Sequence, residues 1–150
     1  METFSALSVL IFIGLFAASS AAFVGLWCLV CSILSRISGW SSLAHLYRAS
    51  QPPLGSGCYF QTGWIGKVSY KNCVSIYASP EGFYLAVFPL FSFAHPPLWI
   101  PWSTVHHITS QKFLWTESVS FDIGSPKITS LTLPKKAFAS LPAMAEEIGP

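Results

Sequence analysis

The chain begins with a long stretch that carries no charge. Between Phe4 and Leu34 every residue is uncharged, and Leu, Ile, Val, Phe and Ala dominate the run. A hydrocarbon core about 30 Å thick is crossed by about 20 helical residues at about 1.5 Å each. The run exceeds that length, so it predicts one tilted transmembrane helix and a single-pass membrane protein.

A cleaved signal peptide is the competing interpretation of this run. Such a peptide has a basic beginning, a short apolar core and small residues at its cleavage site. Ser19–Ala22 imitates the cleavage site, but Met1–Thr3 carries Glu2 and no basic residue. The apolar run also continues to Leu34. We therefore expect an uncleaved transmembrane anchor over residues 1–36.

The charges that flank the run predict its orientation. Arg36 and Arg48 follow it, whereas only Glu2 precedes it. Under the positive-inside rule, the N-terminus lies outside and the rest of the chain lies in the cytoplasm. Trp27 and Trp40 are candidates for interfacial anchoring on the cytoplasmic side.

Small residues recur along the run at a spacing of four. One series is Gly14, Ala18 and Ala22, and a second pair is Ala21 and Gly25. Small residues at this spacing let two helix backbones approach closely in lipid. The series predicts a helix-packing face, although alanine is common in membrane helices and such spacings also arise by chance.

Residues 37–56 form a separate juxtamembrane segment and linker in this interpretation. An amphipathic helix is expected around residues 41–48, with apolar residues on one face: Trp40, Leu43, Leu46 and Tyr47. This helix is expected to rest on the membrane surface. The Pro- and Gly-rich residues 51–57 then break the helix and mark a domain boundary.

From residue 57 the pattern changes to short β-strands separated by turn residues. The predicted strands are 58–64, 68–79, 83–88, 98–102, 105–109, 112–115, 118–123 and 127–133. Residues 135–148 form the only clear helix of this part, and its apolar face would cover the open end of a small sheet. The residues of that face are Ala137, Phe138, Leu141 and Met144.

Two phrases of this region resemble a known fold. The first is Ser79–Leu85, in which the predicted turn Ser79–Gly82, with Pro at its second position, leads into an apolar strand. The second is His95–Trp102, which reads His-Pro-Pro-Leu-Trp-Ile-Pro-Trp. With the strand and helix order, these phrases resemble the pleckstrin-homology-like fold, including its GRAM-type and bacterial relatives. They are similar to phrases in small uncharacterised bacterial membrane proteins. The resemblance covers about residues 57–148 and implies a domain over 57–150. Its implied fold is a barrel or sandwich of about seven antiparallel strands with a C-terminal capping helix.

The composition limits the classes of partner. Charged residues make up 9% of the chain, against about 25% in typical soluble domains. A domain so poor in charge is expected to keep part of its surface against lipid or protein, unless Ser, Thr, Gly and Pro supply its polar surface. The net charge of +2, without a run of Lys and Arg, speaks against nucleic acid.

The residues give no support for an enzyme, a metal or a cofactor. Cys28 and Cys31 form one C-x-x-C motif near the end of the membrane helix, without a second pair, and Cys58 and Cys73 are isolated. We expect the cysteines to be small apolar residues. A Cys58–Cys73 disulfide would require the domain to lie outside the reducing cytoplasm. No triad, paired carboxylates or Gly-rich phosphate loop is evident.

A Pro-rich aromatic loop is the best candidate for an interaction site. Its residues are Phe88, Phe91, Phe93, Trp99 and Trp102. Exposed aromatic anchors are typical of binding surfaces and membrane interfaces, although aromatics also fill small β-cores. The resemblance further implies candidate headgroup contacts at Lys67 and Lys71, for which solvated turn lysines are the alternative.

Together these features predict a non-catalytic, membrane-anchored accessory or scaffolding subunit. It would pack on a larger membrane complex, of which a respiratory or photosynthetic assembly is an example, through its helix and cytoplasmic domain. The expected location is the bacterial inner membrane, either cytoplasmic or intracytoplasmic. The alternative is a stand-alone sensor of lipids or ligands at the membrane surface.

Overall fold

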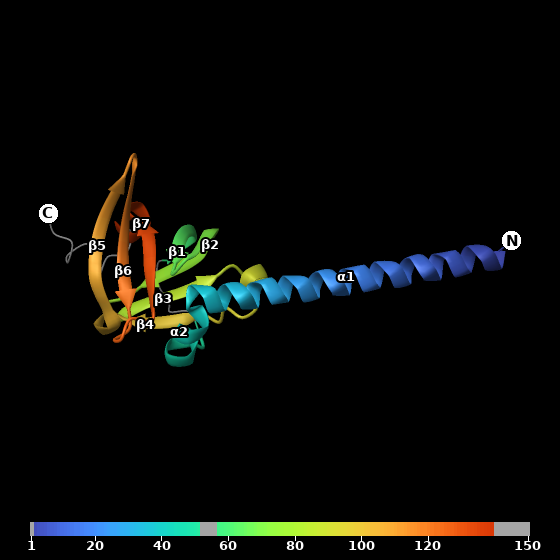
Figure 1. Ribbon diagram of the computed structural model, residues 1–150, viewed down its shortest axis with the longest axis horizontal. Coiled ribbons are helices and arrows are strands. Elements are labelled where there is room, and N and C mark those ends of the chain that lie inside the picture. Colours follow the sequence, from blue (N-terminus) through green and yellow to red (C-terminus); the bar gives the residue numbers. More distant parts are fainter. Residues whose placement is uncertain (1, 52–56, 140–150) are drawn as a thin grey trace.

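The computed structural model describes residues 2–51 and 57–139, so the predicted linker residues 52–56 and the predicted helical residues Leu141 and Met144 lie outside the described residues. One long helix projects from one side of a β-domain (Figure 1). The helices are α1 (Glu2–Ser38), α2 (Trp40–Tyr47) and α3 (Lys135–Ala139), with two 3-10 turns, η1 (Pro89–Phe91) and η2 (Trp102–Thr104). The strands are β1 (Gly57–Ile65), β2 (Val68–Ala78), β3 (Gly82–Val87), β4 (Leu98–Pro101), β5 (Val105–Phe113), β6 (Thr116–Ile123) and β7 (Thr129–Pro134).

Helix α1 is long and apolar enough to cross a membrane. Within its stretch Ser5–Ser38, an 18-residue window has a mean hydropathy of 2.3. A membrane span and a signal sequence near the N-terminus both reach this value. The helix ends at Gly39, which has a φ of 81°. Glycine adopts this left-handed conformation without a steric penalty, so it stops the helix and redirects the chain. The Gly39 N–H donates to the Arg36 carbonyl at 3.2 Å, and α2 begins at the next residue.

The seven strands form one curled, antiparallel half-barrel sheet in the order β4-β3-β2-β1-β7-β6-β5. Strands β1 and β7 join the first four strands to the last three, through the pairs Trp64↔Thr132 and Ile65↔Leu131. Helix α3 packs beside β6 and β7. The predicted fold class, an N-terminal apolar helix followed by about seven antiparallel strands and a short C-terminal helix, is confirmed.

The predicted separate strand at 112–115 is wrong. Strand β5 runs unbroken to Phe113 and pairs with β6, up to the pair Phe113↔Thr116. Leu114 lies at the turn with a φ of 52°. Apolar side chains such as those of Leu114 and Trp115 are common in strands, which is why this segment was predicted as one. The pairing of β5 with β6 instead places both residues in the turn between the two strands. They therefore form the tip of a hairpin.

The core lies on the concave side of the sheet, and its side chains come from both halves. Burial alternates along β7, as expected for a strand with one face against a core. The largest fully buried side chains of the sheet are Phe83, Phe121, Ile65, Ile76, Leu85, Leu98, Ile100, Ile123, Leu131 and Leu133.

Helix α2 also contributes to this core. Trp40 and Leu43 are fully buried in the same cluster as the strand residues, and Tyr47 packs partly against it. Leu46 is 66% exposed, so the expectation that all four apolar residues share one contact face is wrong. The left-handed turn before Trp40 points α2 at the half-barrel, where it contacts β4. The segment that was expected to rest on the membrane surface therefore packs into the domain.

Replacing Trp40 with alanine tests this packing. Removing a fully buried Trp side chain leaves a cavity, so we expect Trp40→Ala to lower the free energy of unfolding of the domain by about 3–5 kcal/mol. Leu46→Ala, on the exposed side of the same helix, should change it by less than about 0.5 kcal/mol. Urea unfolding of the full chain in detergent, followed by circular dichroism, measures both values. Equal effects of the two substitutions would contradict the burial of α2.

Candidate functional site: the helix junction and the exposed apolar surfaces

The last turn of α1 is hydrogen-bonded to the β-domain. The Ser35 hydroxyl donates to the Ala94 carbonyl at 2.6 Å, and the Thr129 hydroxyl donates to the Ser38 carbonyl at 2.7 Å. On α2, the Trp40 indole N–H donates to the Pro96 carbonyl at 2.9 Å. These bonds join the two helices to β7 and to the segment between β3 and β4, so they fix the direction of α1 relative to the sheet.

A buried polar cluster lies beneath this junction. The Tyr70 hydroxyl is 3.1 Å from the Ser38 hydroxyl and 2.8 Å from Nε2 of His95. His95 is 2% exposed, and its Nδ1 lies 3.2 Å from the Phe93 carbonyl oxygen. The imidazole also contacts the Trp40 ring edge-on, at 5.3 Å between centroids. Burial lowers the pKa of His95, and hydrogen bonds to backbone carbonyls partly oppose this shift. Burial raises the pKa of Tyr70. The neutral imidazole therefore belongs to the folded state.

The segment between β3 and β4 reaches α1 at a second point. The Trp27 indole N–H donates to the Leu90 carbonyl at 3.0 Å, and the Trp27 and Phe91 rings lie 5.3 Å apart. Figure 1 shows this segment, the yellow loop near residue 90, alongside α1. Phe88, Leu90 and Phe93 are 41%, 61% and 54% exposed, so this segment presents apolar side chains to its surroundings.

The predicted interaction loop divides between exposed and packed side chains. Phe88 and Phe93 are exposed, whereas Phe91 packs against the core. Trp99 lies half-buried on β4. Trp102 packs on Phe83 at 4.9 Å and donates from its indole N–H to the Ser79 carbonyl at 2.8 Å. The structure thus brings Phe88, Phe91 and Phe93 together near α1, while β4 and η2 hold the two tryptophans.

Tyr59 and Phe60 extend the apolar surface that the loop begins. Their side chains are 57% and 62% exposed, and the Phe60 ring lies 5.9 Å from the Phe88 ring. Phe60 has a φ of 52° within an irregular part of β1. Neither residue was predicted to be an interaction residue, although two successive aromatics in a strand cannot both face one core.

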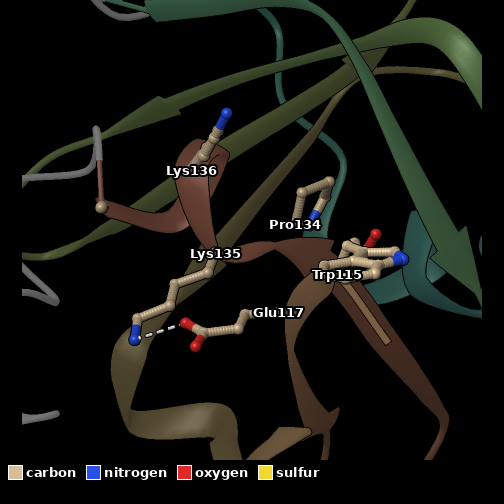
Figure 2. A pocket seen from close by; sticks show the side chains of 7 residues that line it. Trp115, Glu117, Pro134, Lys135 and Lys136 are labelled. Carbon is tan, nitrogen blue, oxygen red and sulfur yellow. Dashed lines mark ion pairs between the residues drawn. The ribbon is translucent and has the colours of Figure 1, made fainter. Parts of the chain in front are cut away.

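The tip of the β5–β6 hairpin is a second exposed apolar surface. It was not predicted from the sequence, because residues 112–115 were expected to form a strand. Leu114 is 72% exposed and Trp115 is 96% exposed. A groove of about 460 Å³ lies between Trp115 and the start of α3 (Figure 2). Lys135 and Glu117 form an ion pair of 2.7 Å along it. The hydrogen bond and charge of Lys135 lower the pKa of Glu117.

The two candidate headgroup lysines lie apart from these surfaces. Lys67 and Lys71 are both exposed. Lys67 lines a groove of about 530 Å³ together with Arg36 and Lys127, and Lys71 does not line it. Lys127 is also paired with Asp122 at 2.7 Å. A basic groove therefore lies where α1 ends, with one of the two predicted lysines in it.

The small residues of α1 are all exposed, on the part of the helix that projects from the domain. They are Gly14, Ala18, Ala21, Ala22 and Gly25. A Cβ atom at Gly14 or Gly25 would meet no other atom within 4 Å. The fold of the chain itself therefore gives no packing reason for glycine at these two places.

The cysteines do not pair in this structure. Cys28, Cys31, Cys58 and Cys73 are all free. Burial raises the pKa of the Cys73 thiol, which favours its protonated form. Among residues 2–51 and 57–139, no three His, Cys, Asp or Glu side chains gather closely enough to hold a metal ion.

The buried imidazole makes the stability of the domain depend on pH. The lowered pKa of His95 means that the unfolded chain, with a His pKa of about 6.5, binds a proton that the folded chain does not. The neutral His95 imidazole therefore makes its full contribution to the free energy of unfolding above about pH 6.5. This contribution is lost as the pH falls toward the pKa of His95 in the folded state. Urea unfolding between pH 7.5 and pH 5 should show this loss in the native chain and a flatter profile in His95→Gln. His45→Gln, at an exposed histidine of α2, should keep the native profile; a loss unchanged in His95→Gln would contradict the assignment.

Comparisons with protein-family models, curated proteins and solved structures found no match to this chain. Its candidate site thus rests on its own geometry. That geometry comprises a junction that fixes α1 to the half-barrel, an apolar surface beside α1, and an apolar hairpin tip.

Proposed function

We propose that this chain is a non-catalytic, membrane-anchored accessory or scaffolding subunit. It packs on a larger integral membrane complex through α1 and through the half-barrel domain, whose strand order supports the resemblance to the pleckstrin-homology-like fold. The location is the inner membrane of a bacterium, and a respiratory or photosynthetic assembly is a suitable partner. The single observation that carries the proposal is Trp115, whose side chain is 96% exposed at the tip of a hairpin.

The hairpin tip has the composition of a protein-binding site. Tryptophan is enriched among the residues that dominate binding energy, especially where it can enter a partner's pocket. Leu114 extends the apolar area of the tip, and the ion pair between Lys135 and Glu117 supplies polar groups beside it. An apolar centre with a polar edge is the usual anatomy of an interface.

The outer face of α1 offers a second contact for a protein partner. Beyond Trp27, where the helix runs beside the domain, the exposed apolar residues are Leu29, Val30, Ile33 and Ile37. The small residues from Gly14 to Gly25 would let a partner helix approach closely within the bilayer. A partner that follows α1 through the membrane and along the domain would cover both sets.

The junction supports an anchor over a cleaved signal sequence. Ser35 and Ser38 bond to the domain, and α1 is continuous from Glu2 to Ser38. A signal sequence is removed from the mature protein, whereas this helix ends within the domain's own hydrogen-bond network. Arg36 and Arg48 lie at the domain end of the helix, which under the positive-inside rule favours a cytoplasmic domain.

The alternative function is a stand-alone sensor of anionic lipid or ligand, and the basic groove favours it. Arg36, Lys67 and Lys127 line that groove at the end of α1. Three cations in one groove can attract a phosphate group. The positive charge of this groove is reduced because Lys127 already forms an ion pair with Asp122. The hairpin tip therefore gives the accessory role the stronger support.

Changing the hairpin tip tests the accessory role. We expect Leu114→Ser combined with Trp115→Ser to weaken partner binding, since loss of a binding-dominant Trp costs about 2 kcal/mol or roughly 30-fold in affinity. Purification in mild detergent followed by quantitative mass spectrometry measures the loss of co-purifying subunits. Trp64→Ser replaces another exposed Trp, on β1, and should leave these subunits in place. If the native chain purified without other subunits, the accessory role would be contradicted. If the double variant kept the same subunits as the native chain, the hairpin tip would not be a binding site for them.

Changing the small residues of α1 tests its packing face separately. Gly14→Leu combined with Ala18→Leu blocks close approach of a second helix without touching the domain, so co-purification should fall. The free energy of unfolding of the domain should not change, because a Cβ atom at Gly14 would meet nothing within 4 Å outside its own part of α1. Phe16→Leu, at a side chain that is 76% exposed, is the matched control. Co-purification equal to that of the control would show that this face binds no helix.

A further inference from the structure

An apolar rim lies on one side of α1, near the point where the helix leaves the domain (Figure 1). It is formed by Tyr59, Phe60, Phe88, Leu90 and Phe93, whose side chains are 41–62% exposed. The rim comes from two segments that are about 30 residues apart in sequence but touch through the Phe60 and Phe88 rings at 5.9 Å. Soluble surfaces seldom gather so many large apolar side chains without a ligand, a protein or a membrane to cover them.

We infer that this rim inserts into the interface of the same bilayer that α1 crosses. The inference rests on the anchoring role proposed for α1. It adds that the domain itself is seated on the membrane, at a depth fixed by the rim. The occupant of the rim is thus lipid, at the boundary between headgroups and acyl chains.

The position of Trp27 carries the inference. Apart from the half-buried Ser8, every side chain from Ser5 to Leu26 is exposed, and burial by the domain begins at Trp27. At about 1.5 Å per residue, Ser5–Leu26 is about 33 Å long, which matches the hydrocarbon thickness of about 30 Å. A bilayer filled by this stretch ends at Trp27. The rim adjoins that point, because Leu90 accepts the hydrogen bond of the Trp27 indole and Phe91 contacts its ring.

The fixed geometry of α1 strengthens this placement. The hydrogen bonds of Ser35, Ser38 and Trp27 hold the helix against the domain at both ends of their contact. The rim therefore cannot swing away from the membrane independently of α1. If the bilayer ended nearer to Arg36, the rim would lie deeper in lipid, so both placements bring it into contact with the membrane.

The side chains of the rim suit the membrane interface. Aromatic rings and an indole at the end of a span form the aromatic belt that is typical of this region. The segment from Phe88 to Pro97 carries no acidic or basic side chain besides His95, which is buried. No charge therefore opposes its insertion. Each buried leucine or phenylalanine gains about 1.5–3 kcal/mol on leaving water, so several rim residues together form a stable contact.

The test uses the full purified chain in vesicles of phosphatidylcholine and phosphatidylglycerol, without any partner protein. A dansylalanine residue replaces Leu90 in one sample and Leu114 in a second, since both leucines are more than half exposed. At Leu90 we expect emission shifted to shorter wavelength, quenching by nitroxide-labelled lipid, and protection from aqueous iodide. At Leu114, on the hairpin tip, we expect the emission and iodide quenching of a probe in water.

Two results would overturn the inference. The first is a probe at Leu90 that is as open to iodide as the probe at Leu114. The second is protection at Leu90 that appears only in native membranes and not in vesicles, which would assign the rim to a protein partner. The vesicles contain no partner, so these results do not depend on co-purification. The inference and the accessory role can therefore fail separately.

Dansylalanine in place of Phe60 provides a further check, because Phe60 lies on β1 and not on the loop. Lipid quenching at both Leu90 and Phe60 supports a rim that inserts as one surface. Quenching at Leu90 together with full iodide access at Phe60 would contradict that surface and restrict any membrane contact to the loop.

Discussion

The bond from Thr129 to the Ser38 carbonyl is the interaction on which the arrangement of the chain depends. A carbonyl in the last turn of a helix has no partner within the helix and must find one elsewhere. Here β7 supplies that partner at 2.7 Å, and the left-handed Gly39 follows directly. The apolar helix therefore ends inside the β-domain, and the next helix can turn into the core. Without this junction, α1 would be a tether; with it, α1 sets the orientation of the sheet.

The polar cluster beneath the junction makes this orientation specific. Tyr70, Ser38 and His95 satisfy one another in a place that water does not reach. Among the described side chains, no buried nitrogen or oxygen is left without a hydrogen-bond partner. A buried polar network is stabilising only when it is complete, because an unpaired member pays its full desolvation cost. The network thus favours one angle between α1 and the sheet, and this angle positions the rim and the hairpin tip.

The sequence predicted more of the fold than of the surface. The uncharged run, the turn at Ser79–Gly82 and the alternation of strand residues were sufficient for the helix and the sheet, because they depend on local patterns. Three features depended instead on strand pairing and on packing against the rest of the domain. Trp40 and Leu43 enter the core only because Gly39 turns α2 toward β4. Trp115 is exposed only because Phe113 pairs with Thr116. Trp102 was expected to be an interaction residue, but its indole N–H donates to the Ser79 carbonyl within the domain.

By itself, the sequence determined that a long apolar helix precedes a domain of short β-strands. Hydrophobic length and the two-residue period of strands require no knowledge of contacts. Only the tertiary structure decided which aromatic side chains are free to bind. An aromatic residue serves equally well in a core and on an interface, so its role depends on what packs against it. In Phe88, Leu90 and Phe93 that packing leaves an apolar surface at the foot of α1, whereas in Phe83 and Trp102 it completes the core.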